Sequence, residues 1–77
     1  MNSLADLAQQ YAESAEAMTE MIEHGNVLLR QARASHNISR LRKLRVRQQD
    51  LYLQRAYLLE TAATLRHYYR HSRQNGI

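Results

Sequence analysis

The chain has 77 residues, 44% of them hydrophobic, a formal net charge of +4 and no cysteine. Such a short chain holds a single domain, residues 1–77, whose core is only marginally stable by itself. The absence of cysteine excludes disulfides, a thiol nucleophile and cysteine-ligated zinc. No apolar run reaches the roughly 18–20 residues of a membrane span, and "MNSLADLAQQ" lacks the layout of a secretory signal, so we expect a cytoplasmic protein.

The composition predicts an all-α fold. Proline is absent, and the two glycines lie at positions 25 and 76. Ala, Leu, Gln, Arg and Glu dominate the rest, and these residues favour helices.

The first helix is predicted over residues 3–34. Ser3 and Asp6 have the spacing of a capping box at its start. An apolar stripe with helical spacing follows, made of Leu4, Leu7, Ala8, Tyr11, Ala15, Met18, Met21, Ile22, Leu28 and Leu29. Gly25 leaves alternatives open: the helix continues, with or without a kink, or it stops and Asn26 caps a short further segment. Gly25 is in heptad phase with Met18, which suits the close passage of a neighbouring helix.

A turn is predicted over residues 35–38, within "ASHNIS". Ser35, Asn37 and Ser39 are each able to cap the helix that follows. The sequence alone does not choose among them.

The second helix is predicted over residues 39–73 and has two apolar stripes. The first is a coiled-coil-like seam of Leu44, Leu51, Leu58 and Leu65 at seven-residue intervals. The positions three before these leucines hold Leu41, Gln48, Arg55 and Ala62, and Tyr69 continues that series. The second stripe, displaced around the helix, holds Val46, Leu53, Tyr57 and Tyr68. One antiparallel partner helix cannot cover both stripes.

We therefore expect an antiparallel helical hairpin of two long helices that dimerises into a four-helix bundle, or docks on another helical protein. The predicted interface joins the leucine seam to the stripe of the first helix. Its members are Leu44, Leu51, Leu58, Leu65, Met18, Ile22 and Leu29.

Charge is divided unevenly between the two helices. Residues 1–36 carry five acids and two arginines, whereas residues 37–77 carry nine cations and two acids. The helices should therefore be partly charge-complementary. The unmatched cations gather around the turn and are Arg30, Arg33, Arg40, Arg42, Lys43, Arg45 and Arg47. They form either a solvated collar that pairs with acids of another subunit, or a site for nucleic-acid phosphates, an acidic protein or an anionic membrane.

Other chemistries have ordinary structural explanations. Tyr68 and Tyr69 lie among arginines as in base-stacking sites, but Tyr69 also falls in the heptad series. His67 and His71 share a helix face but lack a third metal ligand. The glutamates at 13, 16, 20 and 23 have the spacing of a solvated surface. Because a thin hairpin supplies no enclosed pocket, we expect no enzymatic activity, no cofactor and no small-molecule substrate.

The predicted outline resembles small helical hairpins that dimerise, such as plasmid copy-control RNA binders and secretion chaperones. The resemblance is architectural and implies no function. The predicted hairpin differs from basic-zipper proteins, because its leucine repeat starts inside the basic run, at Leu44. We therefore expect a non-enzymatic interaction or adaptor protein, with a nucleic-acid-binding dimer as the alternative.

Overall fold

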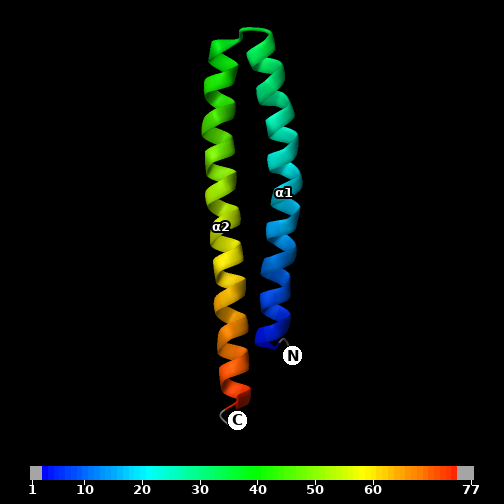
Figure 1. Cartoon of the computed structure of the whole chain (residues 1–77), viewed down its shortest axis with the longest axis vertical. Helices are drawn as coiled ribbons and strands as arrows, with labels where there is room; N and C mark the ends of the chain where they lie inside the picture. Colours follow the sequence, from blue (N-terminus) through cyan, green and yellow to red (C-terminus); the bar gives the residue numbers. More distant parts are fainter. Residues whose placement is uncertain (1–2, 75–77) are drawn as a thin grey trace.

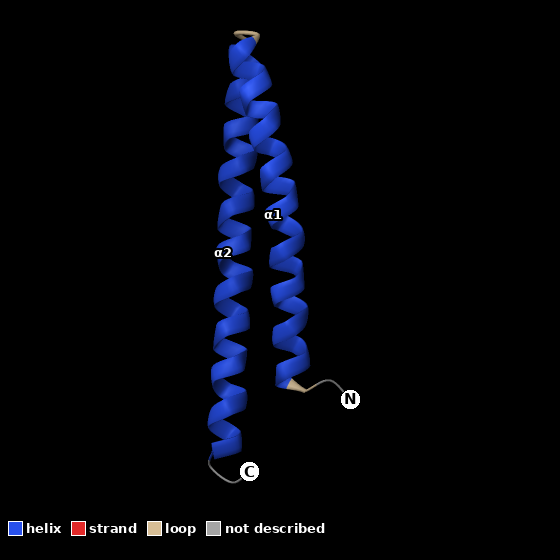
Figure 2. Cartoon of the chain, turned by 45° about the vertical axis from the view of Figure 1, so that its right-hand side comes forward, coloured by secondary structure: helices blue, strands red, loops and turns tan. Residues whose placement is uncertain are grey.

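The structure, a computed structural model, describes residues 3–74, and their side chains as far as residue 70. It contains two helices, α1 (Leu4–Ala34) and α2 (Ile38–Gln74), which lie antiparallel along their length (Figures 1 and 2). The rod measures 61 × 15 × 15 Å. The predicted all-α hairpin is confirmed, and each predicted helix boundary lies within one residue of the observed one.

The start of α1 is fixed by its capping box. The Ser3 hydroxyl accepts a hydrogen bond from the Asp6 amide at 3.1 Å, and the Asp6 carboxylate accepts one from the Ser3 amide at 3.3 Å. The carboxylate also lies at the positive end of the helix dipole. From there α1 runs through Gly25 without a break, which removes the alternative of two shorter segments.

The turn between the helices is tight because Asn37 serves both of them. At the end of α1 the Asn37 amide donates to the Ala32 carbonyl at 3.0 Å, and the His36 amide donates to the Arg33 carbonyl at 3.2 Å. This pair of bonds is a Schellman motif, which needs a left-handed residue after the helix. His36 takes that conformation, with φ 55°. The Asn37 side chain then accepts from the Arg40 amide at 3.2 Å and so caps α2.

We predict that His36→Gly stabilises the hairpin by about 1 kcal/mol, because glycine adopts a positive φ without the steric cost that a Cβ imposes. Urea unfolding followed by circular dichroism measures the change. His36→Ala is the matched control, since it removes the imidazole but keeps the Cβ. Equal stability of the two variants would contradict the conformational explanation.

Candidate interaction site

The interface between α1 and α2 is built mostly from small residues. The buried residues of α1 are Ala8, Ala15, Ile22, Gly25 and Ala32. Opposite them α2 buries Leu44, Gln48, Leu51 and Ala62. Among the described residues no large side chain is less than 2% exposed. The two helices therefore pack closely around a thin interior, which leaves most large apolar side chains at its edges or outside it.

The seven predicted interface residues all lie along this same seam, within one chain. Leu44, Leu51 and Ile22 are buried there. Leu58, Leu65, Met18 and Leu29 are half-buried at its edges. The leucine repeat thus already has a covering helix, namely α1. Contact of these residues with a second chain stays a prediction, and only the half-buried ones are accessible for it in the closed hairpin.

Gln48 is the buried polar residue of the seam, with 4% of its surface exposed. Its side-chain amide donates to the Ile22 carbonyl at 2.8 Å and to the Asn26 side-chain oxygen at 3.0 Å. Its own carbonyl oxygen lies over Gly25 and has no hydrogen-bond partner. A Cβ at Gly25 would come within 2.8 Å of the Gln48 amide nitrogen and closer still to the rest of the carboxamide. The space that a Cβ at Gly25 would need is therefore occupied by the side chain of Gln48, whereas the closer passage of the helix backbone itself stays a prediction.

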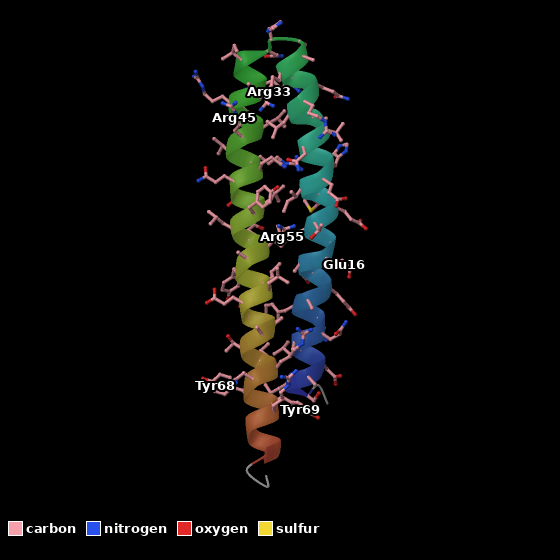
Figure 3. The ribbon with its side chains drawn as sticks, in the orientation of Figure 1. Glu16, Arg33, Arg45, Arg55, Tyr68 and Tyr69 are labelled. Carbon is pink, nitrogen blue, oxygen red and sulfur yellow. The ribbon has the colours of Figure 1, made fainter. Side chains whose placement is uncertain are left out.

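Arg55 is the second polar residue of the seam and links the helices further from the turn. Its guanidinium donates to the Thr19 hydroxyl at 3.2 Å, and the Thr19 hydroxyl donates to the Ala15 carbonyl at 3.2 Å. The guanidinium also lies 5.2 Å from the centroid of the Tyr52 ring, a distance that favours cation–π attraction. Figure 3 shows Arg55 between the two helices. These contacts hold the partly exposed Arg55 side chain between the helices without an acid.

A second apolar surface, which we call the outer stripe, lies on the face of α2 away from the seam. It consists of Val46, Leu53, Tyr57 and Tyr68, which are between 59% and 65% exposed. Figure 3 shows Tyr68 directed away from α1 and Tyr69 directed toward it. The prediction that one helix cannot cover both stripes of α2 is thus confirmed.

Shallow grooves flank the outer stripe and adjoin one another. One is lined by Leu53, Gln54, Tyr57 and Leu58. The next continues from Tyr57 to Tyr68 and is also lined by Glu60, Thr61, Thr64 and Leu65. A third crosses from Leu58 to α1, where it is lined by Leu7, Gln10, Tyr11 and Ser14. The grooves therefore lead from the outer stripe around to α1, where apolar and polar side chains line them together.

The second candidate surface is the basic tip, the seven cations around the turn. All are exposed, and they are Arg30, Arg33, Arg40, Arg42, Lys43, Arg45 and Arg47. No acid occurs in the sequence between Glu23 and Asp50. None of these seven side chains forms an ion pair with another described residue. Figure 3 shows Arg45 pointing into solvent near the turn.

The two helices are predicted to be partly charge-complementary, but no ion pair joins them in the described part of the chain. Glu13, Glu16, Glu20 and Glu23 are all exposed, and Figure 3 shows Glu16 on the side of α1 away from α2. The heptad pattern explains this, because the acids fall on positions opposite the seam. Arg55 lies at a seam position and contacts Thr19 in place of an acid.

The remaining predicted features contribute less to a site. The ring of His67 packs edge-on against Tyr68, with centroids 6.1 Å apart, and the side chain of His71 lies outside the described residues. Over the described part of the chain, no three His, Asp or Glu side chains are grouped closely enough to hold a metal ion. Neither described helix has a stretch long and apolar enough to cross a membrane.

Comparisons with protein-family models, with curated proteins and with solved structures find no match for this chain.

We predict that Gly25→Ala lowers the free energy of unfolding when residue 48 is glutamine and raises it when residue 48 is alanine. With Gln48 present, the new Cβ displaces the carboxamide from its two hydrogen bonds, and stability falls by about 1–2 kcal/mol. In a Gln48→Ala background the space is free, and the better helix propensity of alanine raises stability by about 1 kcal/mol. Urea unfolding of the four proteins in this double-mutant cycle measures both effects. An effect of the same sign in both backgrounds would show that the carboxamide does not determine the need for glycine.

Proposed function

We propose that this protein is a non-enzymatic helical interaction module that acts as a homodimer, an antiparallel four-helix bundle joined through the outer stripe. The observation that carries the proposal is the distribution of apolar side chains. Glycine and alanine fill much of the interior, while Val46, Leu53, Tyr57 and Tyr68 are all more than half exposed. Several large apolar side chains exposed along one face of a small protein are typical of a binding face.

The area of exposed surface supports a second copy as the occupant. The chain exposes 6030 Å², whereas a compact monomer of 9.0 kDa is expected to expose about 4,900 Å². The excess of about 1,100 Å² per chain exceeds the roughly 800 Å² that each partner buries in a stable interface of standard size. A dimer along the length of the rod is able to remove this excess.

Charge supports an antiparallel arrangement of the two copies. A parallel dimer would place two basic tips side by side, and like charges repel. The opposite end of the rod, residues 3–16 and 58–70, carries four acids and two cations, namely Asp6, Glu13, Glu16, Glu60, Arg66 and Arg70. Tyr57 lies midway along the outer stripe, so a two-fold axis near Tyr57 would place Val46 of one copy opposite Tyr68 of the other.

We predict that Leu53→Glu converts the dimer to a monomer, because a carboxylate cannot be buried in an apolar interface without a partner. Light scattering behind size exclusion should give twice the chain mass of 9.0 kDa for the wild type and the single mass for the variant. Circular dichroism reports whether the separated hairpin keeps its helices.

The matched control is Leu59→Glu, the same substitution on the same helix. Leu59 is 50% exposed but lies outside the outer stripe, so this variant should remain dimeric. A monomeric wild type at high concentration would contradict self-association. If the wild type gains mass only when another helical protein is added, that protein and not a second copy covers the outer stripe. Equal loss of dimer in both variants would contradict the assignment of the interface to the outer stripe.

A further inference from the structure

We propose that the basic tip binds the phosphate backbone of nucleic acid without reading the bases. This proposal does not rest on dimerisation, because one hairpin presents the complete tip. It rests on the charge, arrangement and surroundings of the seven cations already described.

The number of positive charges at the tip exceeds the net charge of the whole chain. The tip has seven cations, whereas the net charge of all 77 residues is +4. The rest of the chain is therefore net acidic. All seven side chains are exposed and lack an acidic partner among the described residues. Their charge is therefore directed at solvent, where it attracts a polyanion.

The type and placement of the cations favour phosphates over other anions. Six of the seven are arginines, whose planar guanidinium matches phosphate with paired hydrogen bonds. They surround the tip on more than one side instead of forming one flat patch. A folded acidic protein or a membrane surface meets only one side of such a tip, whereas a flexible chain with a charge at every nucleotide is able to follow it around.

The start of α2 adds hydrogen-bond donors within the same cluster. The Asn37 side chain accepts a hydrogen bond from the Arg40 amide. The amides of Ile38 and Ser39, however, donate to no group of the described chain. The first turn of α2 also contains no acid. The positive end of the helix dipole is thus open to an anion placed among the arginines.

The shape of the tip argues against reading of base sequence. The rod is 15 Å across, which is wider than the roughly 12 Å major groove of B-DNA that admits one helix. The five tyrosines lie at positions 11, 52, 57, 68 and 69, outside the tip, so the tip has no Phe, Tyr or Trp ring on which bases would stack. Of these modes of nucleic-acid binding, contact with the phosphates is the one that fits the tip.

Fluorescence anisotropy with labelled oligonucleotides tests the proposal on the full chain. The probes are single-stranded RNA and single-stranded DNA of about 20 nucleotides and a DNA duplex of about 20 base pairs, each at about 50 and about 200 mM salt. We expect all three probes to bind, without preference among base compositions. Affinity should fall about 10- to 100-fold between the two salt concentrations.

Two charge-matched double variants locate the site. Arg42→Gln/Arg45→Gln removes two cations from the tip, and Arg66→Gln/Arg70→Gln removes two exposed cations from the far end of the same helix. The tip variant should lose about tenfold or more in affinity, and the slope of log affinity against log salt should fall by about 1.4 for a single strand. The far-end variant should change affinity by no more than about twofold. Glutamine is a good helix former, and circular dichroism checks that both variants stay folded.

Three results would overturn the proposal. One is no binding of any oligonucleotide at the lower salt, and another is equal loss of affinity in the two double variants, which would indicate an effect of net charge alone. The third is tighter binding of polyglutamate, or of vesicles containing phosphatidylserine, than of single strands, which would assign the tip to an acidic protein or to a membrane.

Discussion

The close approach of α1 and α2 determines how the rest of the surface is used. At Ala8, Ala15 and Ala32 the first helix presents small residues to the second, and at Gly25 the missing side chain leaves space that Gln48 fills. Leucines of α2 fill the spaces that remain, and further apolar residues of α2 face outward. A hairpin built in this way buries little apolar area for its length, and burial of apolar area is the main favourable contribution to folding. Because the interior is thin, the apolar side chains of the outer stripe remain exposed on the outside of α2.

Polar contacts rather than ion pairs fix the alignment of the two helices. Gln48 lies against Gly25 near the turn, and Arg55 reaches Thr19 further along the rod. A polar side chain within a heptad seam specifies register at some expense of stability. Because these contacts involve no acid, the glutamates of α1 and the arginines around the turn stay exposed and separated along the rod. That separation produces the basic tip, and it is the reason that we propose an antiparallel arrangement of two copies.

Much of the fold follows from local sequence signals. The heptad spacing of Leu44, Leu51, Leu58 and Leu65 identifies the buried face of α2, and the Ser3–Asp6 pair marks the start of α1. The heptad pattern shows which face is buried but not what covers it, so it could not assign the leucines to contact within one chain. The division of charge between the helices predicts that they are partly complementary, but it does not say where the acids lie around α1, and the glutamates of α1 lie away from Arg55 for that reason. The contact of Gln48 with Gly25 depends on a single side-chain conformation, which periodicity does not encode.

If a second copy covers the outer stripe, as we propose, association stabilises the folded hairpin. The most direct test is the midpoint of thermal unfolding, followed by circular dichroism, as the protein concentration is varied about a hundredfold. If folding and association are coupled, mass action requires the midpoint to rise with concentration. A midpoint that stays constant over that range, with full helicity at the lowest concentration, would show that the hairpin is stable alone and would contradict the account.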